Sequence, residues 1–201
     1  MWTLRTPEEQ KTQRFQFIAP LAQVFTIEEC AQIIQLGTEG FGLVDAQIRG
    51  SNIDGSATDN SVRAGQVSWL DPKDSRTHWI YQRVTAAVNQ VNANEWQFDL
   101  DFIEPLQFTC YTETSDRYEA HIDNLIEGST YRKLSFSVQL SDPTTYQGTD
   151  LEFIVGPDDT IAPKMQGCFV AFPSIITHRV TPLVSGKRYS LVGWVCGPKF
   201  R

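Results

Sequence analysis

The chain has 201 residues, of which 41% are hydrophobic and 20% are charged, and its formal net charge is −7. The composition is typical of a globular protein and the length suffices for one hydrophobic core, so we expect a single domain over residues 1–201. The acidic balance argues against a nucleic-acid partner, because phosphate binding requires a basic surface. The sequence has neither an apolar run of the roughly 18–20 residues that span a bilayer nor a signal-peptide core. We therefore expect a cytoplasmic protein without membrane contact.

The first helix is expected directly after a short apolar stretch over residues 15–25, which predicts a strand broken at Pro20. Thr26 and Glu29 have the spacing of a capping box, and apolar residues follow at helical spacing. Gly37 is the expected C-terminal stop of this helix. The segment predicts a short amphipathic helix that packs on the outside of a core.

The next segment combines a polar loop with a second helix. Residues 50–61 are rich in Gly, Ser, Asn and Asp, which is typical of a surface loop and less often of a lid over a pocket. A strand is expected over residues 66–70, and a helix with one apolar stripe from about Asp74 to Asn92. His78 lies in the first turn of that helix, and we leave it out of the site.

The second half of the chain predicts strands without intervening helices. In the first of them, Leu106, Phe108 and Cys110 alternate with polar neighbours, as in a strand buried on one face. The remaining strands are expected at residues 118–123, 134–140, 151–155, 167–172, 175–180 and 188–196. We therefore expect a mainly β fold with flanking helices, in which residues 101–201 form the core and residues 1–100 supply helical support and outer strands.

The four cysteines are widely spaced and form no Cys-x-x-Cys pair, which argues against a thiolate metal site. They are Cys30, Cys110, Cys168 and Cys196. Three of them lie in apolar, strand-like runs, so we interpret them as small buried residues in the reduced form.

The candidate metal ligands are His121, Asp123 and His178. Residues at i and i+2 of a strand point to the same side of the sheet, so His121 and Asp123 are expected to lie side by side. A distant histidine then completes two imidazoles and one carboxylate, the facial triad that holds non-heme Fe(II) and leaves coordination positions open.

A basic residue follows the distal histidine on the last strand. Pro182 and Gly186 predict a turn, after which alternation places one set of side chains on a common face. This set is Arg188, Ser190, Val192 and Trp194. The forked guanidinium of Arg188 suits a carboxylate beside the metal, whereas Lys187 is expected to face the other way.

The spacing of these residues resembles the Fe(II)/2-oxoglutarate-dependent dioxygenases, in particular the prolyl 4-hydroxylase-like branch with its bacterial PKHD-type hydroxylases. The positions that carry the resemblance are His121, Asp123, His178, Pro182, Gly186, Arg188 and Trp194. Tyr118 fits the family's Tyr-x-x-His-x-Asp pattern, and Phe172-Pro173-Ser174 fits the step before the distal histidine. The match covers roughly the last half of the chain in detail.

The resemblance implies a double-stranded β-helix core (jelly-roll, cupin-like) with the metal site at one mouth of the barrel. It implies Fe(II) as the metal, 2-oxoglutarate and O₂ as co-substrates, and ascorbate as an optional addition. Arg188 is then expected to bind the C5 carboxylate of 2-oxoglutarate, and Tyr111 to donate a hydrogen bond to the same cofactor. Ser190 and Trp194 complete the expected cofactor-binding set.

Three departures from the family pattern stand out. One extra residue separates Tyr111 from His121, and Gly148-Thr149-Asp150 replaces the usual Gly-Gly-Glu step. Arg188 stands where collagen-type prolyl hydroxylases have lysine, which aligns the chain with the PKHD-type members.

The leading hypothesis is a hydroxylase of an aliphatic C–H bond in an amino-acid residue, first of all proline in a peptide or protein. The alternatives are a hydroxylase of a free amino acid or small metabolite, a cupin-like metal-binding sensor, and a cupin enzyme that uses another metal. The loops at 50–61, 124–131 and 142–149 are the expected substrate contacts, with Asn124, Arg132 and Trp69 as weaker candidates. The sequence leaves the exact substrate and the oligomeric state open.

Overall fold

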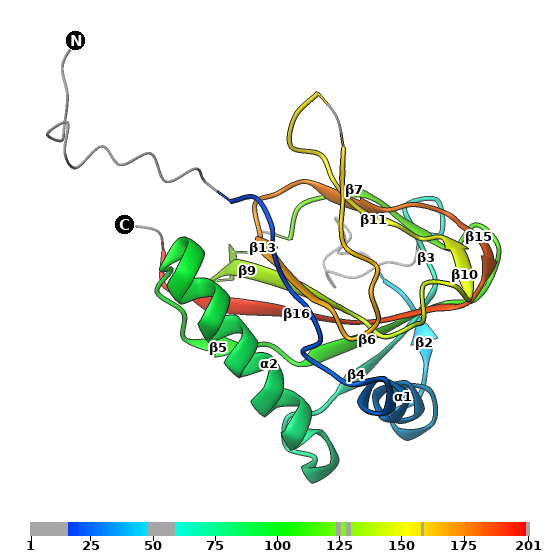
Figure 1. Ribbon diagram of the computed structural model, residues 1–201, viewed down its shortest axis with the longest axis horizontal. Helices are drawn as coiled ribbons and strands as arrows, with labels where there is room; N and C mark the ends of the chain where they lie inside the picture. Colours follow the sequence, from blue (N-terminus) through cyan, green and yellow to red (C-terminus); the bar gives the residue numbers. More distant parts are fainter. Residues whose placement is uncertain (1–15, 48–58, 124–125, 128–129, 158, 200–201) are drawn as a thin grey trace, which may run out of the picture.

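The structure, a computed structural model, describes residues 16–47, 59–123, 126–127, 130–157 and 159–199 (Figure 1). Its larger antiparallel sheet has nine strands, and a smaller five-stranded sheet lies across from it. The larger sheet runs in the order β1 (Ala19–Leu21), β13 (Phe169–Pro173), β9 (Thr130–Gln139), β16 (Arg188–Gly197), β6 (Leu106–Tyr111), β4 (Gln66–Leu70) and β2 (Val44–Asp45), with β5 (Phe102–Ile103) beside β16 and β8 (Ile126–Glu127) beside β9.

The smaller sheet brings together segments that are far apart in the sequence. Its order is β12 (Thr160–Ile161), β11 (Leu151–Phe153), β14 (His178–Val180), β7 (Arg117–His121) and β3 (Arg63–Ala64). A separate pair, β10 (Tyr146–Gly148) and β15 (Leu183–Gly186), closes one end. Two facing antiparallel sheets make the expected double-stranded β-helix, or jelly-roll, core.

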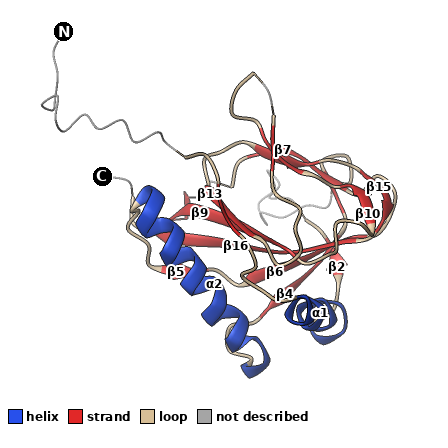
Figure 2. Ribbon diagram, in the orientation of Figure 1, coloured by secondary structure: helices blue, strands red, loops and turns tan. Residues whose placement is uncertain are grey.

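Both long helices pack on the outer face of the larger sheet, away from the smaller one (Figure 2). They are α1 (Ile27–Gln35), which continues as a π-helical turn over Leu36–Gly40, and α2 (His78–Val91), which lies between the 3₁₀ turn Ser75–Thr77 and the π-helical turn Asn92–Trp96. The expected mainly β fold with flanking helices is confirmed. None of the helices in the described part of the chain is long and apolar enough to cross a bilayer.

The two faces of strand β6 have different surroundings. Leu106, Phe108 and Cys110 join the hydrophobic cluster beneath the helices, as their alternation predicted. The intervening residues, Gln107 and Thr109, are also buried, but they face the space between the two sheets. A strand buried on both faces thus separates the structural core from a polar interior.

The N-terminal segment differs from the prediction at Pro20. Instead of breaking a strand, Pro20 is the central residue of β1 and is in register with Val170 of β13. β1 lies at the end of the sheet, where a missing backbone N–H costs no ladder hydrogen bond on the solvent side. The capping box is confirmed, because Thr26 and Glu29 bond reciprocally through side chain and backbone.

Gly37 does not end the first helix as predicted, because the chain continues helically through Gly40. A Cβ atom at Gly37 would lie 2.3 Å from Cγ of Phe108. The glycine is therefore required by the close approach of the helix to β6, and the sequence pattern mistook a packing residue for a stop signal.

Replacing Gly37 by alanine should lower the free energy of unfolding by about 1–3 kcal/mol, as overpacking of a well-filled core does. Gly156→Ala is the matched control, since nothing lies within 4 Å of the added methyl group. Urea denaturation of the two variants measures the difference. Equal stability of both would contradict the packing role assigned to Gly37.

The segment between Pro182 and Gly186 is also more than the predicted turn. Residues 183–186 form β15, and Gly186 has φ +80°, with its Cα facing the carbonyl oxygen of Thr145 so closely that a Cβ would lie 2.1 Å from it. Of the polar loop predicted at residues 50–61, residues 50–58 lie outside the described part of the chain. At its end, Asp59 accepts a hydrogen bond from the Ser61 backbone.

Candidate metal and cofactor site

The predicted ligands meet where strands β7 and β14 pair. His121 is the last residue of β7, His178 is the first residue of β14, and the two are in register. Asp123 lies two residues beyond the end of β7, and its backbone N–H donates to the carbonyl of Ser174 over 3.0 Å. One donor atom from each of the three ligands lies within 4.8 Å of the others. Sheet register thus brings together residues that are 57 positions apart.

Backbone carbonyls orient both imidazoles. Nδ1 of His121 lies 2.7 Å from the carbonyl oxygen of Glu119, and Nδ1 of His178 lies 2.9 Å from that of Ile176. A carbonyl only accepts hydrogen bonds, so each Nδ1 carries the hydrogen and each Nε2 keeps its lone pair. Both Nε2 atoms face the Asp123 carboxylate, at 3.6 Å for His121 and 3.5 Å for His178.

The charge state of the cluster suits metal binding. Burial alone would raise the pKa of the Asp123 carboxyl, but the adjacent His121 and His178 side chains outweigh burial and hold this pKa below its usual range. Burial lowers the pKa of His178, which favours the neutral ring that a metal requires. Three potential ligand atoms therefore face one another within 4.8 Å, as a site for a single metal ion requires.

Aromatic rings hold the two histidines in place. The ring of Tyr118 stacks on His121 with 3.6 Å between centroids. Phe172 packs its edge against His178 at 4.7 Å, and Phe153 lies on the same side at 6.2 Å. Rigid supports of this kind reduce the conformational cost of binding an ion.

The ligands open into a pocket between the two sheets, with about 480 Å³ of empty space including its mouth. All of the predicted site residues line it, namely Tyr111, His121, Asp123, His178, Arg188, Ser190 and Trp194. The structure thus gathers the ligand set and the expected cofactor-binding residues around one cavity.

Arg188 points into this pocket and Lys187 is exposed, as strand alternation predicted. Arg188 is only 2% exposed, and its Nε and Nη2 donate to Oε1 of Gln139 over 3.2 and 2.9 Å. Within the described ranges it pairs with no carboxylate. Since a neutral amide leaves the positive charge uncompensated, the residue is prepared for an anionic ligand.

Tyr111 and Trp194 supply hydrogen-bond donors to the same cavity. Tyr111 is in register with Arg188, whose guanidinium lies 5.6 Å from the phenol ring. Burial raises the pKa of the Tyr111 hydroxyl, although the two arginines beside it oppose the shift, so the group keeps its proton. Nε1 of Trp194 is buried without a hydrogen-bond partner in the described part of the chain. An orphaned indole donor and a phenol hydroxyl beside a cationic side chain fit a carboxylate-bearing cofactor.

Two of the three weaker substrate candidates, Arg132 and Trp69, lie in the described part of the chain. Arg132 forms an ion pair with Glu104 and lies 4.1 Å above the Trp194 ring. Trp69 is 44% exposed, and its ring lies 6.1 Å from that of Trp194. Arg132 and Trp69 thus flank the pocket beside Trp194, whereas Asn124 lies outside the described residues.

Sequence reasoning missed Arg63 and its neighbour Gln107, both of which line the pocket. The alternation of β6 could have placed Gln107, because it shares a face with Tyr111. Arg63 offered no such signal: β3 is two residues long and follows a polar loop, so no periodicity is measurable there.

Comparisons with known proteins agree with this geometry. Residues 106–196 match the family model of the 2OG-Fe(II) oxygenase superfamily. A PKHD-type hydroxylase from Synechococcus elongatus is 36% identical over 180 residues, which cover 86% of this chain and 78% of that relative. Shorter matches span 38% of a PKHD-type hydroxylase from Synechococcus sp. strain CC9605 and 44% of one from Hyphomonas neptunium, less than half of those relatives' length.

Two solved structures have the same fold. A prolyl-4-hydroxylase from Pseudomonas putida has a TM-score of 0.66 at 16% identity, covering 92% of this chain and 94% of the other. A prolyl hydroxylase from Trichoplax adhaerens, solved with a hypoxia inducible factor peptide fragment, has a TM-score of 0.68 at 15% identity, covering 89% and 83%. The chain therefore belongs to the PKHD-type hydroxylases, a family of the 2OG-Fe(II) oxygenase superfamily.

Proposed function

We propose that the protein is an Fe(II)- and 2-oxoglutarate-dependent dioxygenase that hydroxylates an aliphatic C–H bond of an amino-acid residue. One observation carries the proposal: two imidazoles and a carboxylate converge in a pocket that also holds a buried arginine without an acidic partner in the described chain. A metal-binding sensor has no need of Arg188, whereas an enzyme that takes a dicarboxylate does.

His121, Asp123 and His178 would hold the iron through Nε2, a carboxylate oxygen and Nε2. With 2-oxoglutarate and O₂ bound, the metal supplies the oxidative decarboxylation that yields succinate and CO₂ and passes one oxygen atom to the substrate. Arg188 binds the C5 carboxylate of 2-oxoglutarate, and Tyr111 donates its hydroxyl hydrogen to the same molecule. Ser190 and Trp194 line the same pocket and would contact the cofactor there.

Apolar side chains complete the walls of this cavity, and they are Phe136, Leu151, Phe172, Val180 and Val192. Such walls keep water from the reacting centre and strengthen the electrostatic hold of Arg188 on its ligand. The protein therefore positions the bound molecules and excludes water from the site, and the metal supplies the reactivity.

For the substrate we propose a prolyl residue in a peptide or protein, with a free amino acid or small metabolite as the alternative. The peptide bound to the Trichoplax prolyl hydroxylase and the Pseudomonas prolyl-4-hydroxylase support this class. The test is succinate formation from 2-oxoglutarate with Fe(II), with and without proline-containing peptides. Peptides that accelerate succinate release and gain one oxygen atom by mass spectrometry support the proposal. No Fe(II)-dependent succinate under any condition would refute the dioxygenase assignment.

We further propose that residues 1–201 form one domain that works in the cytoplasm. The helices of the first half and the strands of the second share one hydrophobic cluster, which supports a single folding unit. All four cysteines are buried and unpaired, as is usual in a reducing compartment. Among the described residues of the supporting half, Arg63 is the one that lines the pocket.

A further inference from the structure

The pocket contains a second buried arginine, Arg63 of β3, which is 8% exposed. Its Nη2 donates to Oε1 of Gln107 over 2.6 Å, and its Nη1 donates to the backbone carbonyl of Gln47 over 3.1 Å. Its Nε is buried and has no hydrogen-bond partner among the residues that the structure describes. The fork thus keeps an unused donor in the pocket wall.

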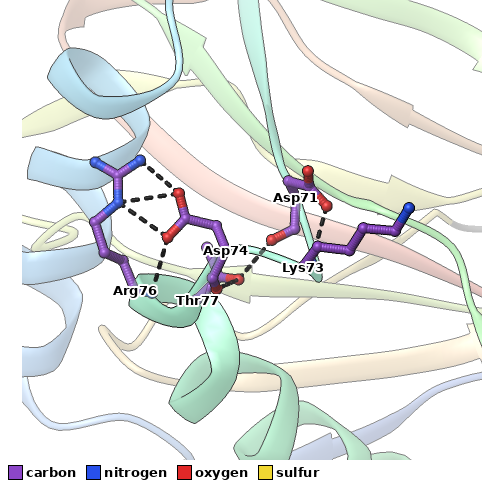
Figure 3. Close-up of polar contacts among 5 residues, drawn as sticks. All are labelled: Asp71, Lys73, Asp74, Arg76 and Thr77. Carbon is purple, nitrogen blue, oxygen red and sulfur yellow. Dashed lines mark hydrogen bonds and ion pairs between the residues drawn. The ribbon is translucent and has the colours of Figure 1, made fainter.

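Arg63 and Arg188 differ from every other arginine in the described ranges, because each of the others has a carboxylate partner. The pairs are Arg76 with Asp74, Arg83 with Glu29, Arg117 with Glu119, Arg132 with Glu104, and Arg179 with Glu152 and Asp159. Figure 3 shows one of these pairs, in which both carboxylate oxygens of Asp74 accept hydrogen bonds from the Arg76 guanidinium. These arginines are neutralised by the chain itself, whereas in the described ranges the two arginines of the pocket donate hydrogen bonds to amide and backbone oxygens and to no carboxylate.

Arg63 lies one aromatic ring away from the metal ligands. Its guanidinium carbon is 4.5 Å from the centroid of Tyr118, with which it is in register, and Tyr118 stacks on His121. The guanidinium, the phenol and the imidazole form a continuous stack along the pocket wall. A group bound by Arg63 would therefore sit within a small molecule's reach of the metal.

Two buried cations in one cavity need two anions, because an uncompensated buried charge is costly. In the proposed function, 2-oxoglutarate gives one carboxylate to Arg188 and the other to the metal, which leaves Arg63 unpaired. We propose that Arg63 binds a carboxylate of the substrate, so that the substrate is an amino acid whose α-carboxylate is free. Both a free amino acid and the C-terminal residue of a peptide carry this group. A planar carboxylate matches the single fork of one arginine in two parallel hydrogen bonds.

This inference rests on the proposed function, and pairs of compounds that differ only in their carboxylate test it. The probes are L-proline and prolinamide, a peptide ending in proline and its C-terminal amide, and a peptide with internal proline. Each is added to protein loaded with Fe(II) and 2-oxoglutarate. The melting temperature is measured without oxygen, and succinate release is measured after oxygen is admitted.

The wild type should prefer the acid over its amide in both readouts. Arg63→Gln should reduce this preference by about 30-fold or more, as expected for losing one partner of a buried charge pair, and should leave the half-saturating 2-oxoglutarate concentration within about twofold. Arg63→Lys keeps the charge and should retain part of the preference. Arg76→Gln, which removes an arginine with its own carboxylate, should behave as the wild type.

The two sources of the carboxylate give different patterns. If L-proline is active and the peptide acid is inactive, the substrate is a free amino acid. If the peptide acid is active and L-proline is inactive, the substrate is the C-terminal residue of a peptide. The inference is wrong if amides and internal proline work as well as acids, if no acid stabilises the wild type, or if Arg63→Gln weakens 2-oxoglutarate instead. A merely structural Arg63 would lower the melting temperature and leave the acid-to-amide ratio unchanged. Succinate formed without any acid preference defeats only this inference, whereas no Fe(II)-dependent succinate defeats the proposed function.

Discussion

Replacing His178 by alanine should abolish turnover and lower Fe(II) affinity by more than about 100-fold, because even the loss of a ligand's hydrogen-bond partner costs 10–100-fold. The reason lies in the geometry: without the His178 imidazole, one nitrogen and the Asp123 carboxylate remain beside an unfilled position. Equilibrium dialysis with metal analysis measures iron binding, and succinate release measures turnover.

His78→Ala is the matched control for this variant. His78 is an exposed residue at the start of α2, remote from the pocket, so its loss should change neither iron binding nor turnover. If His178→Ala binds iron as well as His78→Ala does, the assignment of the three ligands is wrong.

The second large effect is expected at Arg188. Truncation to alanine should raise the half-saturating 2-oxoglutarate concentration by about 30-fold or more, because one partner of a buried charge pair is lost. Iron binding should stay unchanged, since Arg188 contacts Gln139 and Tyr111 and is not one of the three predicted ligands. A 2-oxoglutarate titration of succinate release, run beside metal analysis, separates the two effects.

Lys187→Ala is the matched control, because it removes a positive charge one residue away from Arg188. Lys187 is exposed and directed away from the pocket, so its variant should keep the wild-type requirement for 2-oxoglutarate. If Lys187→Ala raises the half-saturating 2-oxoglutarate concentration and Arg188→Ala does not, the assignment of Arg188 as the cofactor-binding residue is wrong.

The predicted metal ligands at the end of β7 and the pocket arginine on β16 could be identified from the sequence because their spacing follows strand alternation. The spacing of His121 and Asp123, and the parity of Arg188 against Lys187, hold even though β7 ends at His121. Alternation acts over two residues, so it is readable without knowledge of the tertiary structure.

Features set by tertiary contacts were not predictable. Gly37 looked like a helix stop, and only the proximity of Phe108 reveals why a glycine is needed there. Arg63 reaches the pocket because β3 pairs with β7, and a strand of two residues carries no measurable pattern. Pro20 was mistaken for a break because its position at the sheet edge depends on which strands pair.

The central claim is that the pocket binds Fe(II) and 2-oxoglutarate together for oxidation chemistry. The direct test is an anaerobic titration of the Fe(II)-loaded protein with 2-oxoglutarate, followed in the visible spectrum, after which oxygen is admitted and succinate is assayed. We expect a weak metal-to-ligand charge-transfer band that saturates with 2-oxoglutarate, and then succinate formation. Bound iron with neither the band nor succinate would contradict the account and favour a metal-binding sensor or a cupin enzyme of different chemistry.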